Sequence, residues 1–230
     1  MRNNNTIAFL DIETNSENRK ILDLGCVRED GNHFRSTDQK RLIEFLKRTR
    51  FVAGHNIFDF DLTYIGEAIT NAGIGPTYII DTLPLSPLLF PARPYHALLK
   101  DDKLQTDELN NPLNDALKAR DLFYDEIEAF NQLDPTLRHI YYLLLHRQKK
   151  FSAFFRFIQF RPDRTDLPAL IRKKFGNRIC QNLAISEIIL DFPVELAYCL
   201  ALINAFIDHG ETHSITPPWV LKQYPGVEPL

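Results

Sequence analysis

The pattern of hydrophobic positions changes near residue 130. Before it, short apolar and β-branched segments alternate with segments of helical period, which predicts a mixed β-sheet flanked by helices, an α/β fold. After it the strand pattern ends and only helices are expected. The expected strands are 6–12, 20–28, 33–36, 51–54 and 78–81; the expected helices are 38–48, 58–70, 112–130, 135–146, 151–160, 167–175 and 192–209.

This change of pattern predicts three parts: an α/β domain over 1–130, a small all-α subdomain over 131–212, and a proline-rich tail or linker over 213–230. The tail contains four prolines and little helical period. Such an ending is typical of a linker, so the chain is expected to be the N-terminal part of a longer protein.

The composition narrows the class of protein. No apolar run reaches the roughly 18 residues that a membrane span needs, and the first residues lack the apolar core of a secretion signal. Three widely spaced cysteines, Cys26, Cys180 and Cys199, argue against a disulfide framework or a zinc site. We therefore expect a cytoplasmic protein that does not engage a membrane.

Charge is unevenly distributed along the chain. Residues 1–130 have a net charge of −6 and residues 131–230 a net charge of +3; within 147–178, ten basic residues face two acids. A metal site beside a phosphate contact fits this distribution, and a solvated helical face explains the basic run equally well. Five phenylalanines lie among these basic residues, and we expect them to pack inward. The alternative is that they stack on single-stranded nucleic acid.

Acidic residues lie at the ends of three predicted elements. Asp11 and Glu13 end the first strand, where period-two alternation places both on one side, roughly 7 Å apart. Asp59 is expected in the first turn of the helix after the fourth strand, and Asp115 opens the long helix at 112–130. Each acid alone could be an ordinary strand-end or helix-terminal charge.

Together these clusters resemble the motifs of the DEDD, or DnaQ-like, 3′–5′ exonuclease superfamily, which has an RNase H-like fold. The first motif, Asp-x-Glu-Thr, matches residues 11–14. The second matches Gly54-His55-Asn56 followed by Phe58-Asp59, and the third matches Asp115-Ala116. The Asp81-Thr82-Leu83 segment is also similar to that family. The resemblance covers about residues 5–130.

The resemblance implies a two-metal-ion hydrolase that cleaves phosphodiester bonds at nucleic-acid 3′ ends. Asp11, Glu13, Asp59 and Asp115 would be the ligands of two Mg²⁺ or Mn²⁺ ions. The residues that would position the terminal nucleotide are Thr14, His55, Asn56 and Phe58.

The sequence differs from the family at the positions that usually supply the general base. One branch has a histidine five residues before the last acid and the other a tyrosine four residues before it; here these positions are Asn110 and Asn111. An amide cannot take a proton from water. Three explanations stay open: Asn110 only orients a water that the metals activate, His96 is the base, or the site binds nucleic-acid ends without cleaving them.

The resemblance favours DNA with a free 3′ end as substrate and a role such as DNA repair. The order of a nuclease, a helical extension and a proline-rich segment also resembles the N-terminal part of larger bacterial proteins that contain a helicase. Two alternatives remain: a catalytically weak or inactive docking module of a larger helicase or repair machine, and an enzyme that trims small RNAs or nucleotides.

Overall fold

The structure, a computed structural model, describes residues 6–15, 17–93, 96, 98 and 111–205, and it divides the chain into two compact units. The first unit is formed within Met1–Leu83 and Ala97–Asp125, and the second within Pro84–His96 and Glu126–Leu230. The division falls inside one long helix, close to the expected boundary at residue 130. It also assigns residues 84–96 to the second unit, which the hydrophobic pattern did not indicate.

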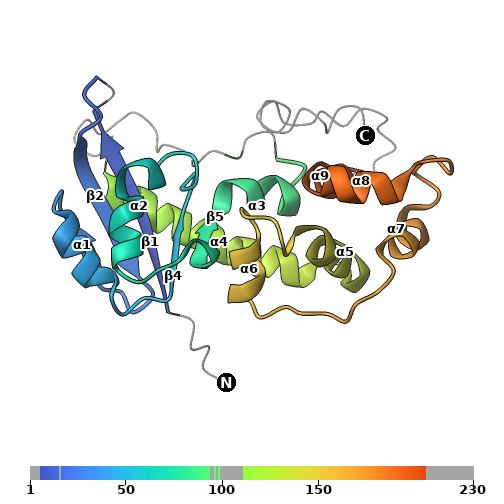
Figure 1. Cartoon of the computed structure of the whole chain (residues 1–230), viewed down its shortest axis with the longest axis horizontal. Helices are drawn as coiled ribbons and strands as arrows, with labels where there is room; N and C mark the ends of the chain where they lie inside the picture. The colour runs from blue at the N-terminus through green and yellow to red at the C-terminus, as the bar shows by residue number, and fades with distance from the viewer. Residues whose placement is uncertain (1–5, 16, 94–95, 97, 99–110, 206–230) are drawn as a thin grey trace. The chain divides into compact units, whose positions relative to one another are not determined.

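The described residues form five strands, nine α-helices and a short 3₁₀ helix (Figure 1). The strands are β1 (Ile7–Thr14), β2 (Ile21–Arg28), β3 (His33–Arg35), β4 (Phe51–Gly54) and β5 (Ile79–Asp81). The helices are α1 (Gln39–Leu46), α2 (Leu62–Asn71), η1 (Pro76–Tyr78), α3 (Thr82–Leu89), α4 (Pro112–Gln132), α5 (Pro135–Leu145), α6 (Ser152–Phe157), α7 (Leu167–Phe175), α8 (Ile185–Asp191) and α9 (Pro193–Ala205).

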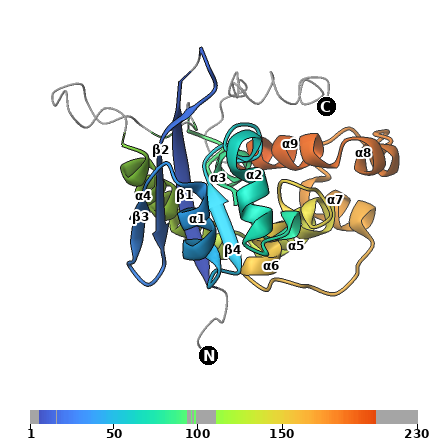
Figure 2. The same cartoon turned by 60° about the vertical axis from the view of Figure 1, so that its left-hand side comes forward.

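The first unit contains a single mixed sheet with the strand order β3-β2-β1-β4-β5 (Figure 2). Strand β1 pairs antiparallel with β2 and parallel with β4, while β4 pairs parallel with β5. The carboxyl ends of the three parallel strands therefore lie at one edge of the sheet. The predicted mixed sheet with flanking helices, followed by a helical part, is confirmed.

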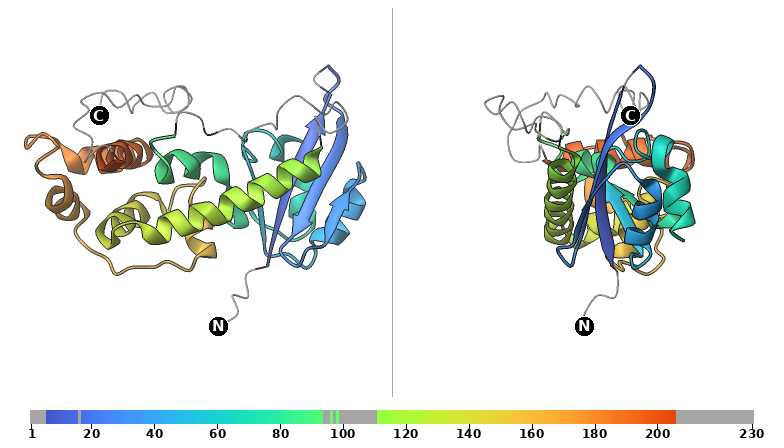
Figure 3. Two further views of the ribbon diagram at one scale, coloured as in Figure 1. Left: turned by 180° about the vertical axis from the view of Figure 1, so that it is seen from behind. Right: turned by 90° about the vertical axis from the view of Figure 1, so that its left-hand side faces the viewer.

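Alternate residues of β1 face two different layers. Ala8, Leu10 and Ile12 belong to a core that also contains residues of α1 and α2. Phe9 lies on the opposite face, where its ring contacts that of Phe123 on α4, with ring centroids 5.7 Å apart. In the right-hand view of Figure 3, the first half of α4 covers one face of the sheet and α1 and α2 the other.

Gly25 on β2 allows α4 to begin very close to the sheet. A Cβ atom at this position would lie 2.2 Å from the backbone nitrogen of Leu113 and 2.3 Å from the carbonyl carbon of Pro112. No side chain fits into such a gap. In the β1–β2 register Gly25 pairs with Asp11, so this contact holds the start of α4 beside that carboxylate.

The start of α4 is defined by Asn111. Its side-chain oxygen accepts a hydrogen bond from the backbone nitrogen of Leu113 at 3.1 Å, and its backbone oxygen accepts from Asn114 and Asp115. Pro112 follows at the first helical position, where its fixed φ and missing N–H carry no penalty. Asn111 is therefore the N-cap of α4.

The second unit is helical and has an aromatic core. Phe151, Phe154, Phe155 and Phe157 are all buried, so the expectation that the phenylalanines pack inward is confirmed for these four. The Phe130 ring meets Phe154 edge-on at 5.5 Å. All ten arginines and lysines between residues 147 and 178 are exposed or half-buried.

Several element boundaries differ from those expected. Helix α2 begins at Leu62 rather than Phe58, because the residues before it form a loop held by hydrogen bonds to Asp81. Helices α3 and α8 were not expected. In α3, Pro84 and Pro87 disrupt the helical pattern, yet its side chains Leu85, Ser86 and Leu88 are buried. The predicted helix at 192–209 corresponds to α9, and residues beyond 205 lie outside the described part.

In the described part of the chain, no single helix has both the length and the apolar character needed to cross a membrane. Helices α8 and α9 together have the length and composition of a membrane span. They are bent by 119° at the break between them, however, and six residues of α9 are buried.

We predict that Gly25→Ala destabilises the protein by about 1–3 kcal/mol or more, because the new methyl group must displace the α4 backbone. Urea denaturation would measure the change in the free energy of unfolding. Gly75→Ala is the matched control, since a Cβ there meets nothing within 4 Å and Gly75 has an ordinary negative φ. Equal effects of the two substitutions would contradict the close-contact interpretation.

Candidate metal centre

The structure brings three of the four predicted carboxylates together. One oxygen each from Asp11, Glu13 and Asp115 can be chosen so that all three lie within 4.8 Å of one another, and all three residues are half-buried. Among the described residues this is the one group of acidic, histidine or cysteine side chains with that spacing. The strand motif and the helix motif therefore meet in space.

The spacing of residues along β1 and α4 explains this meeting. Asp115 precedes Phe123 by eight residues, which is about 12 Å along a helix, and Glu13 follows Phe9 by four, which is about 13 Å along a strand. Because Phe9 and Phe123 are in contact, α4 running antiparallel to β1 places Asp115 beside the carboxylates of β1. The close contact at Gly25 sets the depth of the approach.

A fourth carboxylate, that of Asp61 in the residue before α2, is close enough to Asp11 and Asp81 to feel their charges. It is only 1% exposed, and its Oδ1 atom has no hydrogen-bond partner. Burial raises the pKa of Asp61 well above its usual range, and the nearby charges of Asp11 and Asp81 raise it further, while the backbone N–H groups of Asp61 and Ile12 act in the opposite direction. A buried, unsatisfied carboxylate next to another acid is costly unless a cation binds there.

Asp59, the fourth ligand expected from the sequence, does not belong to the group of three. It is exposed and lies in the loop before α2 rather than in the first turn of that helix. The sequence contains the Phe-Asp pair twice, as Phe58-Asp59 and Phe60-Asp61. Of the two acids, Asp61 is the buried one and the one on which the charge of Asp11 acts. The signal that could have identified it is Leu62, the first residue of an apolar helical pattern.

The loop before α2 is held by the buried carboxylate of Asp81 at the end of β5. Its oxygens accept hydrogen bonds from the backbone nitrogens of Asn56 at 2.8 Å, Phe58 at 3.2 Å and Leu83 at 3.0 Å. Asn56 has a positive φ of 65°, a conformation that asparagine tolerates better than most residues. Asp81 therefore acts as the anchor that shapes this loop and, through it, the position of Asp61.

His55 is tied to the same strand end. Its Nδ1 lies 2.8 Å from the Thr82 hydroxyl, which in turn donates to the Gly54 carbonyl at 3.4 Å. Because that hydroxyl has only one hydrogen, Nδ1 of His55 is the donor in this pair. The hydrogen bond fixes the orientation of the His55 ring.

The other residues expected to position substrate occupy different surroundings. Thr14 is half-buried at the end of β1, next to an irregularity in the pairing with β2. Asn56 is half-buried in the loop after β4. Phe58 packs, partly buried, against the core that contains residues of α1 and α2, so part of its ring supports the fold.

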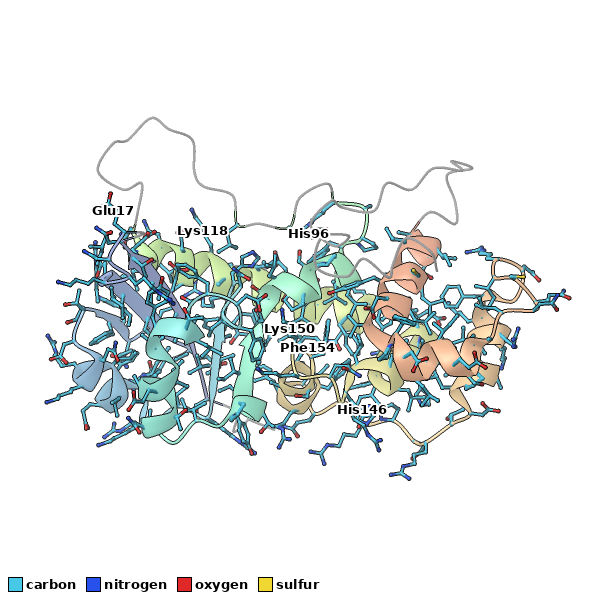
Figure 4. All side chains as sticks on the ribbon, turned by 45° about the horizontal axis from the view of Figure 1, so that its top comes forward. Glu17, His96, Lys118, His146, Lys150 and Phe154 are labelled. Carbon is cyan, nitrogen blue, oxygen red and sulfur yellow. The ribbon has the colours of Figure 1, made fainter. Side chains whose placement is uncertain are left out.

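Two features reduce the repulsion among the carboxylates. Asp115 lies in the first turn of α4, where the helix dipole favours a negative charge. Lys118, one turn later on the same helix, approaches Asp115 with an N–O distance of 3.5 Å; it is labelled in Figure 4. The sequence alone does not distinguish Lys118, because a lysine on an amphipathic helix is a common surface residue.

The structure limits the candidates for the general base. Asn110 lies outside the described residues. Asn111 is engaged as the N-cap of α4. His96 belongs to the second unit, where it is 3% exposed and its Nδ1 lies 2.8 Å from the Ser86 hydroxyl. Burial and the charge of Arg93 lower the pKa of His96 to about 4. Its surroundings give His96 a packing role within that unit.

The side chains at this site fit Mg²⁺ or Mn²⁺. All the donors are carboxylate oxygens, which these hard cations prefer, and the Oδ1 atom of Asp61 has no competing hydrogen bond. Asp11 belongs to the group of three, and its charge also acts on Asp61.

Comparison with known proteins adds no family assignment. No protein-family model matches the chain, and no curated protein sequence matches it.

We predict that Asp61→Asn stabilises the metal-free protein at pH 7. The raised pKa of Asp61 means that the folded state holds this proton more tightly than the unfolded state, so stability is lost as pH rises above about 4, the ordinary aspartate value. An asparagine has no charge to bury, and we expect a melting temperature higher by about 2 °C or more. Thermal denaturation in EDTA at pH 4 and pH 7 measures this. A lower melting temperature for the variant at pH 7 would contradict the interpretation.

We also predict that Mn²⁺ stabilises the protein through Asp11 and Asp61 but not through Asp59. At 100 times the dissociation constant, binding contributes about 2.7 kcal/mol, on the order of 5–10 °C for a chain of this size. Asp11→Asn and Asp61→Asn should lose most of this shift. Asp59→Asn, which changes the same chemical group two residues away from Asp61, should keep it; the reverse result would restore Asp59 as the ligand.

Proposed function

We propose that the chain is a metal-dependent 3′–5′ exonuclease that hydrolyses phosphodiester bonds at nucleic-acid 3′ ends. The observation that supports this most is the meeting of Asp11, Glu13 and Asp115 beside the buried Asp61. These acids come from two motifs and a helix start that are distant in sequence and that resemble the DEDD exonucleases in order. A chance set of surface acids would not be expected at the carboxyl ends of parallel strands.

The proposed roles follow from the positions of the side chains. Asp11, Glu13, Asp61 and Asp115 hold two divalent ions. When bound, such ions supply a nucleophile at neutral pH and stabilise the charge on the leaving oxygen. The loop of His55 and Asn56, shaped by Asp81, lies at the same sheet edge and positions the terminal nucleotide. Thr14, at the end of β1, is a further residue that would contact the terminal nucleotide.

The substrate we propose is DNA, in a parent protein that also contains a helicase. The excess of basic residues after position 130 supports a nucleic-acid partner, because these charges can bind phosphates. A non-catalytic docking module is the second candidate. The N-cap role of Asn111 favours it, because that side chain is engaged in the helix start and has no proton-accepting group.

The activity is tested with 5′-labelled single-stranded DNA in Mg²⁺ and in Mn²⁺. We expect a ladder of products shortened from the 3′ end. Asp11→Asn, Asp61→Asn and Asp115→Asn should each lower the rate by at least about 10²-fold, on the scale of losing one electrostatic contributor to the transition state. Asp59→Asn should retain most of the rate.

Three results would overturn parts of the proposal. No shortening with either metal, by protein that still binds Mn²⁺, would replace the exonuclease with the docking module. Activity that survives Asp11→Asn would place the reaction elsewhere. A matched RNA strand cleaved faster than DNA would change the proposed substrate while keeping the site.

A further inference from the structure

The helical unit contains a pocket of about 260 Å³ with aromatic and basic walls. Helix α5 contributes Tyr142, and His146 lies directly after the end of that helix. Helix α6 contributes Phe155 and Arg156, and the segment that follows contributes Phe160 and Arg161. All of these residues belong to the second unit, so the pocket is separate in sequence from the carboxylates.

The aromatic wall of the pocket is held in a defined arrangement. The Tyr142 ring meets Phe155 edge-on, with centroids 5.4 Å apart and an interplanar angle of 87°, and it meets Phe160 at 5.9 Å. The His146 ring stacks almost parallel to the Tyr142 ring, with centroids 4.5 Å apart and an interplanar angle of 11°. Phe155 is buried, whereas Tyr142, His146 and Phe160 remain half-buried and accessible.

A strained turn places Phe160 in this wall. Gln159 has a positive φ of 55°, which is uncommon for a residue with a side chain. The backbone nitrogen of Phe160 donates to the Phe155 carbonyl at 3.2 Å, closing the end of α6 with the 6→1 hydrogen bond of a Schellman motif. The turn therefore folds Phe160 back over the helix that carries Phe155. Strain of this kind often accompanies a binding site.

The polar side chains give the pocket a positive character. Nδ1 of His146 donates to the Tyr142 carbonyl at 2.8 Å, because a carbonyl can only accept; Nε2 is thus the ring nitrogen left for other contacts (Figure 4). Between residues 135 and 165 the sequence has seven arginines and lysines but only one acid, Asp163. A negatively charged ligand is therefore favoured over a neutral or cationic one.

We infer that this pocket binds one nucleotide of a single-stranded nucleic acid. The base stacks on the exposed ring surface of Tyr142, His146 and Phe160, and the phosphate is bound by Arg156 and Arg161. A volume of about 260 Å³ lies just below the roughly 300–1,000 Å³ of drug-sized sites, which suits a single base with its sugar. The rings that contact the base thus differ from the buried phenylalanines of α6. Binding in this pocket does not depend on cleavage at the carboxylates.

The test is fluorescence anisotropy of the full chain with a labelled oligo(dT) strand, in EDTA so that no divalent ion reaches the carboxylates. Tyr142→Leu should weaken binding about 5- to 100-fold, the range expected for one stacked base. Arg161→Ala should weaken it about 10-fold and reduce the slope of log affinity against log salt by about 0.7, as for one lost phosphate contact. Thermal denaturation checks that each variant is folded.

Two matched controls distinguish a pocket from a diffuse surface. Arg164→Ala removes an exposed arginine that does not line the pocket, and Phe192→Leu removes an exposed aromatic ring elsewhere in this unit. Both should change the affinity less than about 2-fold. If Arg164→Ala and Arg161→Ala act equally, or if Tyr142→Leu has no effect, the pocket assignment is wrong.

A competition arm identifies the source of the nucleotide. Free dTMP should displace the strand only at much higher concentration, because it offers one phosphate and no neighbouring nucleotides. Displacement at equal concentration would overturn the assignment to a strand in favour of free nucleotides. Strand binding is measured in EDTA and strand shortening in Mg²⁺ or Mn²⁺, so that a failure of the proposed nuclease activity and a failure of the pocket give different results.

Discussion

The candidate centre depends on a contact between two stretches of backbone. Helix α4 can bring Asp115 to the carboxylates of β1 only because Gly25 has no side chain, which lets the first turn of the helix touch β2 beside Asp11. The buried positions Ala116 and Ala119 continue this close packing, and Phe123 ends it against Phe9. The spacing of the three carboxylates is therefore set by the packing of a helix on a sheet, while the carboxylates themselves repel one another in the absence of a cation.

The sequence could predict most of the fold, and the reasons for the failures are local. Strands and amphipathic helices with an ordinary hydrophobic period, such as β1, α1 and α5, were found close to their true bounds. Helix α3 was missed because its two prolines are unusual in a helix, and only its burial in the second unit explains why it forms. The proximity of Asp11, Glu13 and Asp115 could be predicted from motifs. The burial of Asp61 and the exposure of Asp59 could not, because they depend on where α2 begins, and the loop before α2 is held by hydrogen bonds to the distant Asp81.

Asp61 and Asp81 show how the same chemical group serves two purposes within one edge of the sheet. Both are almost fully buried. Asp81 accepts three backbone hydrogen bonds and is a structural anchor, whereas Asp61 has an oxygen with no partner and is destabilising without a cation. Hydrogen bonding thus separates a carboxylate that stabilises the loop from one that is available to a ligand. A protein that retains such an unsatisfied group sacrifices stability at the place where binding would recover it.

The N-cap of α4 has a consequence for how this site could change over evolutionary time. Asn111 occupies one of the two positions where the DEDD exonucleases, whose motifs this sequence resembles, place a proton acceptor, and here its side chain begins the helix that carries Asp115. Exchanging it for tyrosine would remove a cap worth about 1 kcal/mol and loosen the very turn that presents the ligand. Helix initiation and proton transfer therefore compete for one residue. A proton acceptor for this site would therefore be expected from another part of the chain rather than from position 111.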